Sequence, residues 1–263
     1  MEVRPSLADQ IKFALGKNRL ALAVYNRLSR DPRFVAGCEM ANAVAVNRFG
    51  YNDHGIVHVG ITAVNALRIF ELLDKAAVVP TFVAEKHGSK ADAQLIVLLG
   101  ALLHDIGNAI SRENHHIHGV TYAQPILEDA LAVCYDSDKL QKVKLAVLAC
   151  IFEHDESVRA TSIEAGIIKP ADGMDCESGR ARIPYRMFGR NDIHSLSALA
   201  ITRVEAVAGE SRPVLIRVYM DNPAGMFQIQ QVLQKKIASA GPVAQLIEVQ
   251  PVLNGKPLAK IRV

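Results

Sequence analysis

The chain has 263 residues, a length that fits one large domain or one domain with a small companion. Hydrophobic residues make up 50% of the chain and charged residues 22%, which is the balance of a globular protein. Its net charge of +3 gives no support for a nucleic-acid partner. The cysteines form no Cys-x-x-Cys pair, which excludes zinc-ribbon and thioredoxin-like sites; they are Cys38, Cys134, Cys150 and Cys176.

The N-terminus already contains the charged residues Glu2, Arg4 and Asp9, so no signal peptide is expected. The longest strongly apolar run lies near residues 95–103, far short of the ~20 residues that a membrane span needs. We therefore expect a soluble, cytoplasmic protein without a membrane partner.

The first three quarters of the chain have the apolar spacing of helices. The expected helical segments lie at about 11–22, 41–46, 58–73, 91–109, 120–134 and 139–153. The fourth is apolar on nearly every side, which places it in the middle of a bundle. Turn-forming residues predict connections at 50–53, 80–89, 136–138 and 166–179.

The pattern changes after about Gly189. Strands are expected at 196–207, 213–220, 244–253 and 258–263. A helix from Asn222, its N-cap, to about Ala240 separates the two pairs of strands. The fold class is therefore mainly α, with a helical domain at 1–190 and a small α+β domain of unknown role at 195–263.

His104 and Asp105 end the most apolar segment. An imidazole and a carboxylate there need partners, because unpaired polar groups are costly to bury. A divalent metal would satisfy both side chains and offset the negative charge. The pair alone is equally well explained by a hydrogen-bonded contact in the core.

An ordered set of histidines and acids surrounds this pair. His54 and His58 precede it and share a face if their stretch is helical. Gly55 stands where zinc proteases with a His-Glu-x-x-His motif have Glu, which excludes that class. The residues that follow the pair are His115, His116, His118, His154 and Asp172.

The order H…HD…H…H…D resembles the HD superfamily of metal-dependent phosphohydrolases, whose fold is all helical. The matching stretches are Asp53-His54-Gly55-x-x-His58, Leu102-Leu103-His104-Asp105-Ile106-Gly107 and Ala171-Asp172. The similarity spans roughly residues 51–182 and is greatest to stand-alone prokaryotic HD proteins. The resemblance implies an HD-domain helical bundle over the first 190 residues.

The resemblance also implies a site. Its metal ligands would be His58, His104, Asp105, His115, His154 and Asp172, with His116 as the alternative to His115. Asp105 would bridge two metals and act in catalysis, together with His54 and Arg112. From its position, His54 could orient a ligand or face the substrate, although a surface helix residue explains it equally well, and Arg112, which lies between two ligand segments, could reach a phosphate. Nitrogen and oxygen ligands suit one or two divalent ions of Mn, Fe, Co, Zn or Mg, among which the sequence does not choose.

Other candidates are weaker. Lys169, Arg180 and Arg182 lie near Asp172 and could reach a phosphate, although each is better explained as a solvated surface residue. The turn at 222–225 could present backbone N–H groups to an anion, but a simple helix cap is the preferred interpretation.

The expected function is hydrolysis of a phosphomonoester or phosphodiester, in a nucleotide or a related small phosphate compound, by a metal-activated water. Asn108 replaces the Lys of cyclic-dinucleotide members, and their Gly-Tyr-Pro element is absent, so that subfamily is not implied. Two alternatives stay open: a diiron oxygenase on the same ligands, and a non-catalytic, metal-stabilised regulator that binds a ligand. The sequence does not identify the substrate or decide whether the chain forms a homo-oligomer.

Overall fold

The computed structural model describes residues 5–177, 197 and 199–262. The predicted candidates Arg180 and Arg182 lie outside these residues. The N-terminal part is a helical bundle composed of α1 (Leu7–Leu15), α2 (Arg19–Leu28), α3 (Pro32–Asn42), η1 (Ala43–Arg48), α4 (Ile56–Lys75), α5 (Thr81–Ala84), α6 (Lys90–Leu103), η2 (Ile106–Ala109), α7 (His115–Leu131), α8 (Ser137–Glu153) and α9 (Ile163–Gly173).

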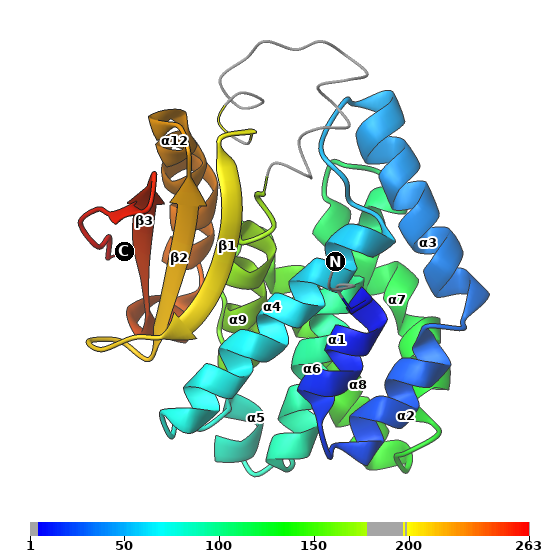
Figure 1. The fold of residues 1–263 in the computed structure, drawn as a ribbon. Coiled ribbons are helices and arrows are strands. Elements are labelled where there is room, and N and C mark those ends of the chain that lie inside the picture. The colour runs from blue at the N-terminus through cyan, green and yellow to red at the C-terminus, as the bar shows by residue number, and fades with distance from the viewer. Residues whose placement is uncertain (1–4, 178–196, 198, 263) are drawn as a thin grey trace.

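Helix α6 lies at the centre of the bundle, as its uniform apolar character predicts. Ser89 and Asp92 form a capping box at its start, and every residue from Leu95 to Leu103 is buried. Helices α2, α4, α8 and α9 pack around it (Figure 1). The end of α6, where His104 and Asp105 follow, therefore opens into the middle of the protein.

Residues 201–262, here called the C-terminal extension, form a small sheet with one helical connection. The strands β1 (Ile201–Ala208), β2 (Val214–Met220), β3 (Ile247–Leu253) and β4 (Lys256–Pro257) lie in the order β1-β2-β3-β4. β2 and β3 are parallel, and the other neighbours are antiparallel. The connection from β2 to β3 contains η3 (Pro223–Gly225), α12 (Met226–Gln228), η4 (Ile229–Leu233), α13 (Gln234–Ala238) and η5 (Gly241–Leu246).

Several sequence predictions of elements were wrong: the segment expected at 11–22 is divided between α1 and α2, and the connection expected at 80–89 contains α5. The connection expected at 166–179 begins within helix α9, and the strand expected at 258–263 is reduced in the described part to one bridge between Ile261 and Val249. Gly166 and Gly173 look like helix breakers in the sequence. In the structure they allow close packing, since a Cβ atom at Gly166 would lie 2.5 Å from the carbonyl oxygen of Ala240.

The extension lies against two helices of the bundle. Its connecting segments η4 and α13 pack on α9, while β1 and β2 pack on α4 (Figure 1). The Arg68 guanidinium donates to the carbonyl of Ala206 at 3.1 Å, and the backbone N–H of Ala160 donates to Ser239 at 2.9 Å. α9, which carries Asp172, is thus enclosed between the bundle and the extension.

Helix α4 is long and apolar enough to cross a membrane by length and composition alone. However, 61% of its apolar window is buried inside the protein. It packs against α1, α6, α9 and β1 in the described structure. These contacts explain its apolar character as that of a core helix.

Candidate metal centre

The loop before α4 brings His54 and His58 to the centre of the bundle. The Asp53 carboxylate accepts hydrogen bonds from the backbone N–H groups of Gly55 (2.9 Å) and His58 (3.2 Å) and so fixes the start of the helix. A Cβ atom at Gly55 would lie 2.9 Å from Cβ of Asn42, which explains the glycine. His54 precedes the helix, so the two histidines do not share a helical face.

His104 follows the last residue of the buried helix α6, and His154 follows the last residue of α8, which is buried along one face. Nδ1 of His104 donates to the carbonyl of Ala101 at 2.8 Å. Nδ1 of His154 donates to the carbonyl of Ile151 at 2.6 Å. Carbonyls in the last helical turn lack an intrahelical partner and can only accept. Both rings are therefore protonated on Nδ1 and present the lone pair of Nε2.

Helix α7 approaches the His-Asp turn closely because position 107 is glycine. A Cβ atom at Gly107 would lie 1.9 Å from the carbonyl oxygen of His115. His115, the first residue of α7, thereby places Nε2 at 3.4 Å from Oδ1 of Asp105. His116 lies toward Asp155 instead, with Nδ1 at 3.8 Å from Oδ2.

Asp105 faces two separate pairs of imidazoles with its two carboxylate oxygens. Oδ2 lies 3.3 Å from Nε2 of His58 and 3.4 Å from Nε2 of His104. Oδ1 lies 3.4 Å from Nε2 of His115 and 3.6 Å from Nε2 of His154. The Nε2 atoms are 3.2 Å apart in the first pair and 3.0 Å apart in the second. Two clusters of donor atoms therefore share one carboxylate.

Asp172, near the end of α9, belongs to the first cluster. Its Oδ1 lies 3.3 Å from Nε2 of His58 and 3.8 Å from Nε2 of His104. The ligand atoms of these three residues all lie within 4.8 Å of one another, a spacing that could hold a metal ion. The structure thus brings together the residues predicted as ligands, with His115 rather than His116 beside Asp105.

The nitrogen and oxygen atoms of this cluster are electron-pair donors that point toward one another, an arrangement that suits a bound cation. Nδ1 of His58 lies 2.6 Å from Oδ2 of Asp175, so this ring is also protonated on Nδ1. Nε2 of His58 lies 3.2 Å from Nε2 of His104, and both atoms also lie within 4 Å of a carboxylate oxygen of Asp105 and of Asp172. A divalent cation would satisfy both nitrogen atoms and the neighbouring carboxylates.

Metal ligands must be ionised carboxylates or neutral imidazoles, and the groups around Asp105 and His115 shift their pKa values in that direction. Burial alone would raise the pKa of Asp105, but the neighbouring His104 and His54 imidazoles outweigh this effect and hold the pKa well below its ordinary value. Burial, followed by the proximity of His154, lowers the pKa of His115 to about 3. At neutral pH the carboxylate is ionised and the His115 imidazole is neutral.

Comparisons with known proteins identify the family of this chain. The profile of the HD domain matches residues 63–176, which include the His104-Asp105 pair and Asp172. An uncharacterized protein of Methanocaldococcus jannaschii is 42% identical over 220 residues, which are 83% of this chain and 84% of that protein. The chain belongs to the HD-domain family. No solved structure gives a significant match.

HD-domain proteins are mostly metal-dependent hydrolases, and the family confirms the resemblance inferred from the motifs. The mainly helical fold with a small α+β extension is also as predicted. A His/Asp cluster suited to divalent metal lies where the HD motifs meet. The profile begins after His54 and His58, so these two residues are placed by the structure alone.

Two supporting residues in this HD domain escaped the sequence analysis. Oδ2 of Asp175 lies 2.6 Å from Nδ1 of His58, on the side of the ring away from the other ligands. In the sequence, only its position three residues after Asp172 could have indicated that it lies near the site. Asn108, noted only as a departure from one subfamily, donates to Oδ1 of Asp105 at 2.9 Å. Its own Oδ1 accepts from the Arg112 guanidinium at 3.0 Å. Asn108 thus links Arg112 to Asp105.

A cleft of about 460 Å³ opens over the metal centre. His54 and Arg112, both predicted to act in catalysis, line it, and Nδ1 of His54 lies 2.8 Å from Oδ2 of Asp105. The ligands that face the cleft are Asp105, His115, His154 and Asp172, whereas His58 and His104 are fully buried behind them. A ligand in the cleft would therefore meet the second cluster first.

Lys169 is fully buried and does not line this cleft, so neither the predicted phosphate contact nor the predicted solvated position is correct. Its ammonium donates to the carbonyls of Asp155 and Val158, both at 2.6 Å, and to Oγ of Ser239 at 3.0 Å. All three N–H groups are therefore used. Lys169 instead fixes the loop after His154 to α9 and to the C-terminal extension.

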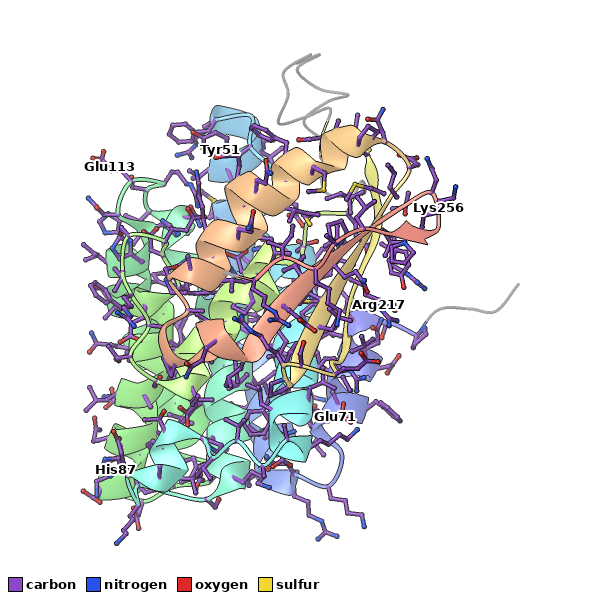
Figure 2. All side chains as sticks on the ribbon, turned by 90° about the vertical axis from the view of Figure 1, so that its left-hand side faces the viewer. Tyr51, Glu71, His87, Glu113, Arg217 and Lys256 are labelled. Carbon is purple, nitrogen blue, oxygen red and sulfur yellow. The ribbon has the colours of Figure 1, made fainter. Side chains whose placement is uncertain are left out.

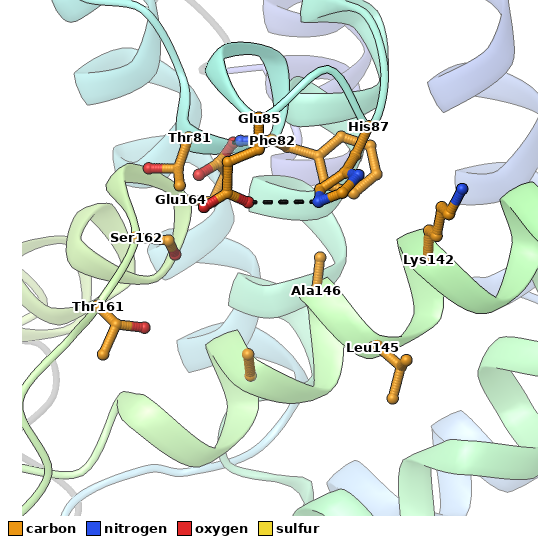
Figure 3. Close-up of a pocket in the computed structure, with 11 residues that line it drawn as sticks. Thr81, Phe82, Glu85, His87, Lys142, Leu145, Ala146, Thr161, Ser162 and Glu164 are labelled. Atoms are coloured by element: carbon orange, nitrogen blue, oxygen red, sulfur yellow. Dashed lines mark hydrogen bonds and ion pairs between the residues drawn. The ribbon is translucent and has the colours of Figure 1, made fainter.

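A second cavity, of about 410 Å³, lies near α5 and α8 and is lined by none of the described residues predicted for the site (Figure 3). Glu164 lines it and accepts a hydrogen bond from the N–H of Phe82 at 2.9 Å, which satisfies the start of α5. Figure 2 shows His87, from this cavity, at the other end of the molecule from Tyr51, whose ring packs near Arg112. The cavity is thus separate from the metal centre.

Proposed function

We propose that this protein is a metal-dependent phosphohydrolase that cleaves a phosphoester in a small phosphorylated compound, such as a nucleotide. The observation that carries the proposal is the position of Asp105. Each of its carboxylate oxygens lies within 3.6 Å of a different pair of histidine Nε2 atoms. This arrangement supports a dinuclear centre in which Asp105 bridges the two ions.

The ligands are imidazole nitrogens and carboxylate oxygens, which suit divalent Mn, Fe, Co or Zn. Ions bound here would lower the pKa of a water, so that hydroxide forms at neutral pH, and would offset the charge on a phosphoryl group. The residues that would hold them are His58, His104 and Asp172 on one side of Asp105, and His115 and His154 on the other.

The remaining residues of the cleft suit a phosphoryl group. Arg112 is held by Asn108 at 3.0 Å and can stabilise charge that develops on phosphoryl oxygens. His54 shares the cleft and can exchange a proton with Asp105 or with a bound ligand, because Nδ1 lies 2.8 Å from Oδ2. A cleft of about 460 Å³ has the size of a small-molecule site.

The test compares wild type with Asp105→Ala on a panel of phosphomonoesters, phosphodiesters and nucleotides in the presence of Mn²⁺, Co²⁺ or Mg²⁺. We expect Asp105→Ala to reduce hydrolysis by about 10³-fold or more, because the bridging ligand is lost. The matched control is Asp138→Ala, which removes a carboxylate that is 80% exposed and should leave the rate unchanged.

Oxygen uptake by the iron-loaded protein is measured in parallel, since a diiron oxygenase would use the same ligands. Oxygen uptake without hydrolysis of any phosphoester would contradict the proposal. Full hydrolysis by Asp105→Ala would contradict the role given to this residue.

A further inference from the structure

The face of α9 that meets the C-terminal extension is built for close contact. Gly166, Lys169 and Gly173 share this face, since they are three and four residues apart. A Cβ atom at Gly173 would lie 3.2 Å from Cδ1 of Leu233 and 3.4 Å from Cγ of Lys236. Small residues at this contact bring the α13 backbone near the end of α9, where Asp172 lies.

Lys236 on α13 reaches the metal centre from this contact. Its Nζ lies 2.8 Å from Oδ2 of Asp172, and it also donates to the carbonyl of His154 at 3.2 Å. The Lys236 side chain is only 13% exposed. Two of the predicted metal ligands are therefore in contact with one residue of the extension.

The extension also forms part of the cleft wall. Val232 and Lys236 line the cleft together with Arg112 and the ligands of the second cluster. A lysine ammonium has three N–H groups. Those of Lys236 have two acceptors within the described residues, which leaves one N–H for an oxygen atom of a bound molecule.

We propose that the C-terminal extension completes the active-site cleft through Lys236. Lys236 holds Oδ2 of Asp172, so that Oδ1 stays turned toward His58 and His104, and it binds an oxygen of the substrate's anionic group. The substrate class is thus an anion small enough to be enclosed between the bundle and α13. This inference rests on the proposed function and extends it, because it makes substrate binding depend on the extension.

The test uses Lys236→Met with Lys235→Met as the matched control. Both variants remove one positive charge from the same helix, but Lys235 is exposed and does not line the metal cleft. A third variant, Lys236→Arg, keeps the charge.

The first measurement is thermal unfolding of the metal-free proteins. Lys236→Met leaves the buried Asp172 carboxylate without its cation, which is strongly destabilising. We expect its midpoint to lie below that of Lys235→Met, and the difference to shrink when Mn²⁺ is added, because the ion replaces the lost charge. Equal midpoints for the two metal-free variants would overturn the role of Lys236 in holding Asp172.

The second measurement is binding of inorganic phosphate to the Mn²⁺-loaded proteins by calorimetry, after equal metal content has been verified. Loss of a hydrogen bond from a charged donor should weaken phosphate binding about tenfold in Lys236→Met. Lys235→Met should bind as wild type does, and Lys236→Arg should recover part of the affinity. Equal affinity in Lys236→Met and Lys235→Met, or no binding by wild type, would overturn the anion site.

Neither measurement requires turnover, so the two proposals fail separately. Phosphate binding that depends on Lys236, in a protein that hydrolyses no phosphoester, would refute the proposed function and leave this inference standing. Hydrolysis that is unaffected by Lys236→Met, with unchanged phosphate affinity, would support the proposed function and refute the inference about Lys236.

Discussion

Three histidines of the centre are fixed by the hydrogen bond that each makes on its far side. His104 and His154 donate to carbonyls at helix ends, and His58 faces the carboxylate of Asp175. In each case Nδ1 carries the proton and Nε2 is left for a metal. Partners of this kind set both the tautomer and the orientation of the ring before any ion binds.

Asp175 provides a test at the scale of one residue. Asp175→Ala removes the acceptor 2.6 Å from Nδ1 of His58, so the ring loses its fixed orientation. We expect affinity for Co²⁺ in the first cluster to fall by roughly 10-fold to 100-fold, measured by titration with spectroscopic detection. Asp175→Asn retains an acceptor and should lose less.

Unchanged Co²⁺ affinity in Asp175→Ala would show that the contact does not support the metal site.

Sequence reasoning gave the residue types of the centre but not their contacts. The order of histidines and acids predicted the residues that converge on Asp105, because His58, His104 and Asp172 lie in recognisable motifs and His115 and His154 follow in the expected order. The sequence left His115 and His116 as alternatives, since adjacent residues differ only in the direction that the helix gives them. Lys169 resisted prediction because its acceptors are backbone carbonyls, which have no sequence signature.

Element boundaries matter because three of the predicted ligands lie at the ends of helices. His104, His154 and Asp172 all lie within one residue of the last residue of α6, α8 or α9. The helices that carry His58 and His115 and those that precede His104 and His154 could be predicted from apolar spacing, and α6 most clearly of all, whereas most of α3 lay outside the expected segments. α9 could not, because Gly166, Pro170 and Gly173 suggest a loop when their packing partners are unknown.

Gly107 provides a test at the scale of two packed elements. A methyl group there would lie 1.9 Å from the backbone oxygen of His115, so Gly107→Ala must push α7 away from η2. We expect a loss of about 3 kcal/mol in unfolding free energy and weaker metal binding. Denaturant unfolding with metal titration measures both effects.

The control is Gly255→Ala, because Gly255 has φ +78° but no atom within 4 Å of the added methyl group. Its cost should be limited to about 1 kcal/mol of backbone strain. A Gly107→Ala variant no less stable than Gly255→Ala would contradict the role of the close contact.

At the scale of the whole molecule, the bundle supplies the predicted ligands, and residues of the extension line the same cleft. The sequence predicted strands around one helix at the C-terminus, but it gave no role for them. The contact between Asp172 and Lys236 joins residues 64 positions apart, and no motif connects them. Such a pairing follows from how α13 packs on α9, which a single sequence does not reveal.

The central claim is that Asp105 bridges two metal ions, and counting the ions per chain tests it most directly. Elemental analysis of Mn²⁺- or Co²⁺-loaded protein should give about two ions in wild type and about one in His154→Ala, which removes a ligand of only one cluster. A single ion in wild type, unchanged in His154→Ala, would contradict the account.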